Sequence, residues 1–221
     1  YPASTEREPL SLTLFPDEAV VQMQTHANDG SELLDRQEDV ARAKYVANPQ
    51  PKRRNIILVV GDALRPDHMS VNGYGRPTTP FLDSLHQAGK VRQATDMTAT
   101  CAESSCGLLG ILQSKYVHQL TRRAISLYEV LRLHGYRIEQ ILSGDHTNFY
   151  GLKSVYGPVD RYFDGTMMAN FYMIDQVVVL DYVQQMPRWN GQPVLLQFHL
   201  MSSHGLGKRH EDLQRFGAGL N

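Results

Sequence analysis

The sequence predicts an α/β domain in which a mostly parallel sheet is flanked by helices. Two segments, 55–61 and 193–200, indicate buried strands because their side chains are almost continuously apolar. A third strand-like segment, 136–142, lies between them, and helix-like segments separate all three. Strands that alternate with helices are typical of parallel sheets, because each helical crossover returns the chain to the same end of the sheet.

The composition limits the number of domains and the classes of partner. The chain has 221 residues, of which 42% are hydrophobic, and a formal net charge of -1. This length suits one large domain, or one domain with a tail. A nearly neutral chain offers no broad surface for polyanions, so we predict no nucleic-acid partner. No run approaches the roughly 20 apolar residues that span a bilayer, and we expect membrane contact only through segments outside this chain.

Residues 1–54 differ from the rest of the chain and are interpreted as an approach segment with a linker. The segment 31–46 predicts a mostly polar surface helix, and the proline-bearing stretch 48–54 predicts a linker. We assign residues 55–221 to the domain itself.

Capping residues bound the helices predicted within this domain. Thr79 and Pro80 supply an N-cap and a first-turn proline for a helix through Gln87. Gly135 occupies the C′ position after a helix over 126–134. Further helices are expected over 103–113 and 170–185, with a short extended segment over 91–95.

Polar residues follow each of the three predicted strands. Asp62 comes after the first, Asp145 and His146 after the second, and His199 and His204 at or after the end of the third. Ligand and active sites of open α/β sheets lie beyond the carboxyl ends of the strands. Carboxylates and imidazoles are also the usual ligands of a divalent metal that polarises an anionic substrate. The pattern therefore predicts a metal and anion site, although the two aspartates also suit turns or caps and His199 suits a hydrogen-bonded core.

The segment 98–107 places several nucleophile-type side chains at the start of a predicted helix. Thr100 and Cys101 are the candidates there, because helix N-terminal N–H groups favour anions and lower the pKa of a thiol or hydroxyl. Cys101 and Cys106 also suit small buried apolar side chains or a disulfide pair.

The order of these motifs resembles the sulfatase branch of the alkaline phosphatase superfamily, which includes sulfatases, phosphoethanolamine transferases and lipoteichoic acid synthases. Residues 55–82 resemble the opening of that family, with a strand, an acid, a Gly-Tyr-Gly-Arg loop and a Thr-Pro-x-Leu helix start. Residues 101–109 resemble its nucleophile segment, and residues 135–146 resemble the strand and basic loop that follow. His199 to Gly205 is similar to the His-x-x-x-Ser-His-Gly segment of the transferases.

The resemblance, which spans about residues 54–207, implies an alkaline-phosphatase-like fold and a two-step, metal-assisted transfer through a covalent enzyme intermediate. It implies a divalent ion (Zn, Mn, Mg or Ca) held by Asp62 and by the nucleophile, which is Cys101 or Thr100. His204 and His146 would hold the anion or protonate the leaving oxygen. The residues that would bind substrate are Arg65, Asp145 and His199.

The departures from the family pattern favour transfer of a phospho-group. Sulfatases carry Cys-x-Pro-x-Arg so that the cysteine is oxidised to formylglycine, but Glu103 and Ser105 occupy the third and fifth positions here. We therefore expect a phosphoethanolamine- or phosphoglycerol-type transferase or a phosphodiesterase, acting on an anionic ester such as a lipid head group. The alternatives are a sulfatase and a non-catalytic module that retains the fold.

The Asp-His pair that completes the family's metal site does not occur between Gly205 and Asn221. We therefore expect this chain to be the N-terminal part of a catalytic domain that is incomplete at its C-terminus. Alone it should bind metal weakly and turn over little or no substrate. The family resemblance also implies an extracytoplasmic location, periplasmic or at the cell surface, with anchoring helices outside this chain.

Overall fold

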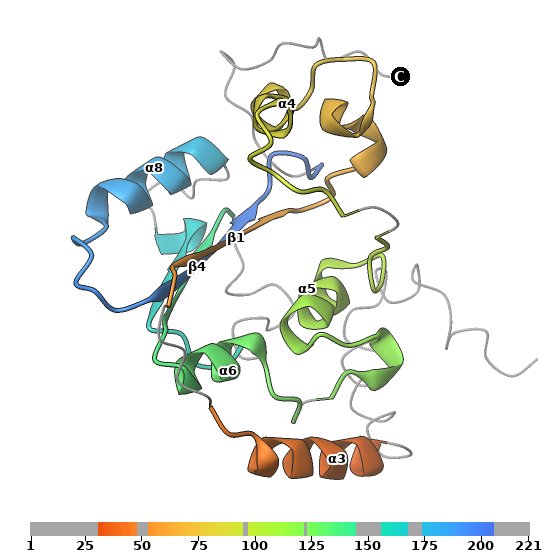
Figure 1. The fold of residues 1–221 in the computed structure, drawn as a ribbon, viewed down its shortest axis with the longest axis vertical. Coiled ribbons are helices and arrows are strands. Elements are labelled where there is room, and N and C mark those ends of the chain that lie inside the picture. Colours follow the sequence, from red (N-terminus) through yellow and green to blue (C-terminus); the bar gives the residue numbers. More distant parts are fainter. Residues whose placement is uncertain are drawn as a thin grey trace, which may run out of the picture.

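A four-stranded parallel sheet forms the centre of the protein (Figure 1). The computed structural model describes residues 31–47, 53–94, 97–121, 123–144, 156–167 and 174–205. The strands are β1 (Ile56–Gly61), β2 (Arg137–Leu142), β3 (Arg161–Asp164) and β4 (Val194–Leu200). Their order in the sheet is β1-β4-β2-β3, and every neighbouring pair is parallel. The predicted α/β class with a mostly parallel sheet is confirmed.

Helices separate the strands along the chain. The α-helices are α3 (Ser31–Lys44), α4 (Pro80–Gln87), α5 (Ser104–Gln113), α6 (Leu127–Leu133) and α8 (Asp175–Gln185). Short 3-10 helices cover Pro66–His68, Ser70–Asn72, Val117–Gln119 and Gly165–Met167. Residues 91–94, where an extended segment was expected, contain no strand, whereas β3 was not predicted.

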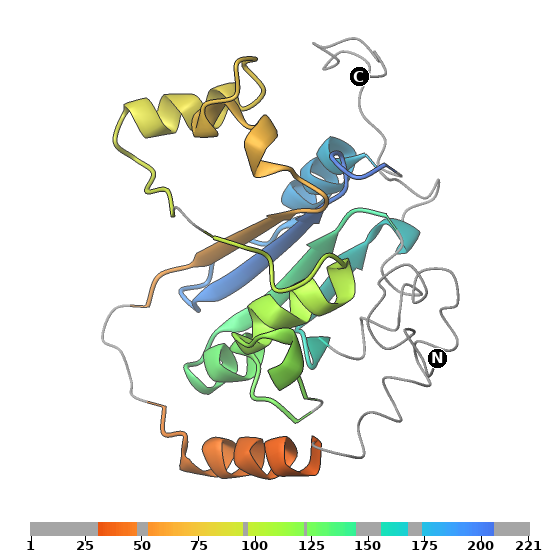
Figure 2. The same ribbon diagram turned by 90° about the vertical axis from the view of Figure 1, so that its right-hand side faces the viewer.

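The two faces of the sheet carry different helices (Figures 1 and 2). Alternate strand residues point to opposite faces. On one face Leu58, Ile138 and Leu195 pack with side chains of α5 and α6, including Leu108 and Tyr128. On the other face α8 packs against β2, β3 and β4. The core on this face consists of Ile141, Phe163, Val178, Tyr182, Val194 and Leu196. The expectation that helices flank the sheet is therefore confirmed.

The start and end signals of α6 show how local chemistry bounds these helices. The Ser126 hydroxyl accepts a hydrogen bond from the Glu129 backbone N–H at 3.2 Å, and the Glu129 carboxylate accepts one from the Ser126 N–H at 2.9 Å. This reciprocal capping box satisfies two N–H groups that a helix leaves unpaired. Gly135 follows with a φ of 80°, the left-handed conformation that ends helices at low cost in glycine.

Helix α3 lies against the domain through ion pairs. Glu38, only 7% exposed, pairs with Lys115, and Asp39 pairs with Arg123 at 2.6 Å. Arg42 pairs with Glu129, the residue that completes the cap of α6. Helix α3 therefore makes defined contacts with residues near α5 and α6. Within the described residues, no helix is both long and apolar enough to cross a membrane.

A buried polar group ties α6 to the sheet. The Tyr128 hydroxyl, which is fully buried, donates to Gln197 Oε1 in β4 and accepts from Gln140 Nε2 in β2 at 2.6 Å. Removing the hydroxyl would leave both amides without this partner in the core, where an unmade hydrogen bond is costly.

We predict that Tyr128→Phe lowers the free energy of unfolding by about 1–3 kcal/mol, measured by urea denaturation. The matched control is Tyr136→Phe, because the Tyr136 hydroxyl donates to the Arg54 carbonyl at 2.9 Å in an exposed position. This control should change stability by less than about 0.5 kcal/mol. Equal stability of Tyr128→Phe and wild type would contradict the assignment.

Candidate functional site

The candidate site lies where β1 and β4 end side by side. Asp62 directly follows β1, and its backbone N–H donates to the carbonyl of Leu200, the last residue of β4, at 2.8 Å. His199 of β4 is 1% exposed, and its Nε2 lies 3.5 Å from Asp62 Oδ2. Parallel pairing of the two strands therefore brings a carboxylate and an imidazole together.

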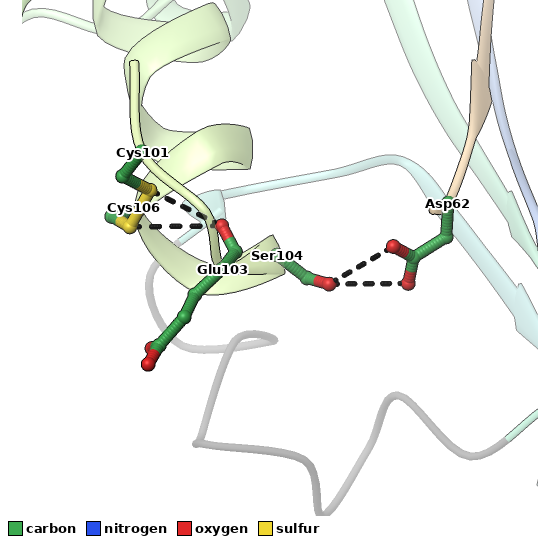
Figure 3. The surroundings of a disulfide bond; sticks show 5 residues. All are labelled: Asp62, Cys101, Glu103, Ser104 and Cys106. Carbon is green, nitrogen blue, oxygen red and sulfur yellow. Dashed lines mark hydrogen bonds between the residues drawn. A yellow bond between two sulfur atoms is a disulfide. The ribbon is translucent and has the colours of Figure 1, made fainter. Parts of the chain in front are cut away.

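Ser104 is the third member of the site. It is the first residue of α5, and its hydroxyl lies 3.1 Å from each carboxylate oxygen of Asp62, to which it donates (Figure 3). The preceding residue, Glu103, is the N-cap in extended conformation. The hydroxyl thus lies at a helix N-terminus, where backbone N–H groups and the helix dipole favour negative charge.

The loop after β4 adds His204 to this edge of the sheet. The Ser203 hydroxyl donates to the Asp62 carbonyl oxygen at 2.9 Å, and the His204 N–H donates to the Met201 carbonyl at 2.9 Å. His204 is close enough to Asp62 to lower the pKa of that carboxyl electrostatically. Asp62, His199 and His204 are therefore brought together, as the positions after the strands predicted.

The environment of Asp62 favours its carboxylate form. Its pKa lies below the ordinary aspartate value, chiefly because of the adjacent His199 imidazole. The hydrogen bond from Ser104 and the charge of His204 lower the pKa further, and partial burial opposes them. An ionised carboxylate beside a hydroxyl is a donor set that suits a divalent cation. The described residues nevertheless contain no cluster of three or more His, Cys, Asp or Glu that could hold a metal.

A disulfide encloses the segment that carries Ser104. Cys101 and Cys106 are bonded to each other, with their Cα atoms 6.1 Å apart (Figure 3). The sequence left open whether these cysteines are buried apolar side chains or a disulfide pair, and in the structure they form the disulfide. In this oxidised form Cys101 has no thiol, and only a thiolate acts as a nucleophile or metal ligand.

Thr100, the other candidate nucleophile, packs against the body of α5. A Cβ at Gly110 would lie 2.6 Å from Thr100 Oγ1, so the threonine side chain lies directly on that glycine. Among the described residues, no hydrogen bond joins Asp62 to Thr100 or Cys101, whereas two join it to Ser104. Sequence reasoning missed Ser104 within the cluster 98–107, although its place at the start of the helix was an available signal.

The remaining predicted residues lie apart or outside the described chain. Arg65 forms an exposed pair with Asp67 at 2.5 Å. Asp145 and His146 lie outside the described residues.

A pocket of about 970 Å³ adjoins the site. Its lining combines the polar residues Asp62, Ser104, His199 and His204 with apolar ones such as Leu64 and Ile111.

Comparison with known proteins identifies the family. The family model described as Sulfatase matches residues 54–217, and the chain belongs to that family. The chain is similar to phosphatidylethanolamine transferase Mcr-2 of Escherichia coli, with 26% identity over 167 residues, 70% of this chain and 30% of that protein. The predicted sulfatase-like family is confirmed.

Solved structures share the fold. The soluble domain of lipooligosaccharide phosphoethanolamine transferase A from Neisseria meningitidis matches with a TM-score of 0.63 and 21% identity, over 78% of this chain and 53% of that one. An alkaline phosphatase superfamily protein from Vibrio parahaemolyticus matches with a TM-score of 0.61 and 19% identity, over 77% and 46%.

The zinc complex of the C-terminal periplasmic domain of EcEptC from Escherichia coli matches with a TM-score of 0.54 and 20% identity, over 80% of this chain and 56% of that one. These likenesses confirm the alkaline-phosphatase-like fold. The chain spans about half the length of these solved structures and under a third of Mcr-2.

We predict that Asp62 of the metal-free protein titrates below the ordinary aspartate pKa of about 3.9, measured by carboxyl ¹³C NMR. A pKa that is lower in the folded state means that the ionised group stabilises the fold above about pH 4 and that this contribution is lost as the pH falls through the lowered value. His199→Leu removes the donor that is the main cause and should raise the pKa, whereas His86→Leu at an exposed position should not. An Asp62 pKa at or above the ordinary value would contradict this.

Proposed function

We propose that the protein is a metal-dependent transferase or phosphodiesterase that acts on phosphate esters through a covalent enzyme intermediate. The observation that carries this proposal is the Ser104 hydroxyl, held against both oxygens of the Asp62 carboxylate at the start of α5. A hydroxyl so placed becomes an activated nucleophile once a bound cation lowers its pKa or a base accepts its proton.

The substrate class follows from the family and from what the sequence lacks. Membership of the Sulfatase family allows sulfate or phosphate esters, and the relative Mcr-2 is a phosphatidylethanolamine transferase. The absence of Cys-x-Pro-x-Arg and the bonded state of Cys101 disfavour a formylglycine sulfatase. The proposed substrate is a phosphoethanolamine- or phosphoglycerol-type ester, including a lipid head group. The disulfide and the periplasmic EcEptC domain support an extracytoplasmic location.

Each residue of the site has a separate role in the proposed reaction. The proposed metal ligands are Asp62 and the Ser104 oxygen, and a divalent ion bound there would favour the alkoxide and neutralise phosphoryl charge. Ser104 loses its hydroxyl proton to solvent, its Oγ attacks phosphorus to form an O–P bond, and the bond to the leaving oxygen breaks. His204 holds the phosphoryl oxygens or gives the leaving oxygen its proton. Water or an acceptor alcohol then attacks the phosphoserine and releases Ser104.

Two alternative functions are each supported by one observation. Family membership alone is compatible with a sulfatase. A non-catalytic module is favoured by the incomplete set of metal ligands among the described residues. The expectation that residues 1–221 alone turn over little or no substrate stays a prediction.

We predict that incubating the full-length gene product with phosphatidylethanolamine and Zn²⁺ adds one phosphoethanolamine group to Ser104, located by tandem mass spectrometry. Ser104→Ala should abolish the adduct and lower turnover by at least about 10³-fold, because the nucleophile is lost. Thr100→Ala, which removes a hydroxyl and a methyl group four residues earlier, is the control and should retain the adduct. An adduct on Thr100, or one that survives Ser104→Ala, would contradict the assignment of the nucleophile.

We also predict that a non-reducing digest with a protease that cuts after Glu103 yields one peptide pair linked between Cys101 and Cys106, since the structure bonds these two cysteines. Alkylation after reduction should label both residues, and alkylation without reduction should label neither. Formylglycine at position 101 would instead support the sulfatase alternative, and unlinked thiols would reopen Cys101 as a nucleophile.

A further inference from the structure

Asp175 makes two buried contacts that the proposed reaction does not use. It is the first residue of α8 and is 8% exposed. Its Oδ1 accepts from the Met201 backbone N–H at 2.8 Å, and its Oδ2 accepts from the Ser202 N–H at 2.9 Å. One carboxylate therefore holds two successive amides of the turn that leaves β4.

That turn connects Asp175 to the site. The next residue, Ser203, donates its hydroxyl to the Asp62 carbonyl oxygen, and the His204 N–H donates back to Met201. The turn is thus fixed on one side by α8 and on the other by Asp62. His204 lies two residues after the second anchored amide, so its position depends on both anchors.

An ionised carboxylate suits this position for two reasons. It lies at the start of a helix, where negative charge is favourable. Hydrogen bonds to a charged acceptor are also stronger than neutral ones, and a carboxylate can accept through both oxygens. An asparagine retains one acceptor oxygen and turns an N–H₂ group toward the second amide, which has no acceptor there.

We propose that Asp175 is a positioning residue, which holds the Met201–Ser202 turn so that His204 lies beside Asp62. Helix α8 is itself fixed to the sheet through the buried Val178 and Tyr182, so the anchor is rigid. A role for Asp175 in catalysis rests on the proposed function, whereas its effect on the position of His204 does not.

The test uses the 221-residue protein without metal or substrate, comparing wild type, Asp175→Asn and Asp181→Asn by NMR. Asp181 is a matched control because it lies on the same helix and accepts only from the Gln185 side chain in the described structure. In Asp175→Asn, amide hydrogen exchange at Met201 and Ser202 should accelerate by about tenfold or more, and the His204 ring signals should shift. Exchange at Gln197 within β4 should stay within about twofold of wild type. Asp181→Asn should change none of these signals.

Unchanged amide exchange at both Met201 and Ser202 would overturn the proposal. Faster exchange with unshifted His204 ring signals would also overturn it, because Asp175 would then hold the turn without positioning the histidine. A uniform loss of protection along β4 would show a general structural role and would also overturn it. If Asp175→Asn does not fold, Asp175→Glu retains the charge and displaces the oxygens by one methylene. The same two accelerated amides and shifted ring are then required. Because the mass-spectrometric test of Ser104 is separate, failure of one proposal is distinguishable from failure of the other.

Discussion

The rest of the structure depends on the insertion of β4 between β1 and β2. His199 lies opposite Val60 on one side and Leu142 on the other. Both pairings are parallel, so the chain leaves all three strands at one edge of the sheet. The register matters because a shift of one residue would turn His199 to the face covered by α8. Long-range pairing of residues about 140 apart along the chain therefore creates the site.

The segment before α5 supplies the second requirement, which is a hydroxyl at a fixed position. The disulfide between Cys101 and Cys106 joins this segment to the first turn of α5. Gly110 lets Thr100 lie directly on the helix, where any larger residue would collide with it. Both contacts constrain the chain on either side of Ser104. The position of the hydroxyl is thus set by covalent and packing constraints and not by Asp62 alone.

Much of the fold could be predicted because strong local signals agree with the tertiary structure. The aliphatic runs before Asp62 and around Leu195 are strands, and Thr79, Ser126 and Gly135 lie at or next to helix ends as their capping preferences indicate. The strand β3 was missed because its four residues begin and end with a charged side chain and carry little periodic signal.

The site was less predictable than the fold. Asp62 and His204 could be grouped because both follow strands, and the strands of a parallel sheet finish at the same end of the sheet. Ser104 was not distinguished from Thr100 and Cys101, since its place at the helix start does not show which of these side chains faces Asp62. Asp175 gave no signal at all, because its partners are backbone amides 26 and 27 residues away.

The contacts of Asp62 show why the parts of this site are interdependent. Its N–H binds Leu200, its carbonyl accepts from Ser203, and its carboxylate meets Ser104 and His199. These contacts come from β4, from the turn after it and from the start of α5, and all orient one residue. Changes to residues that share a partner do not add independently. The energetic effect of altering Ser104 therefore depends on whether His199 and the turn after β4 still hold Asp62, so the site acts as one coupled unit.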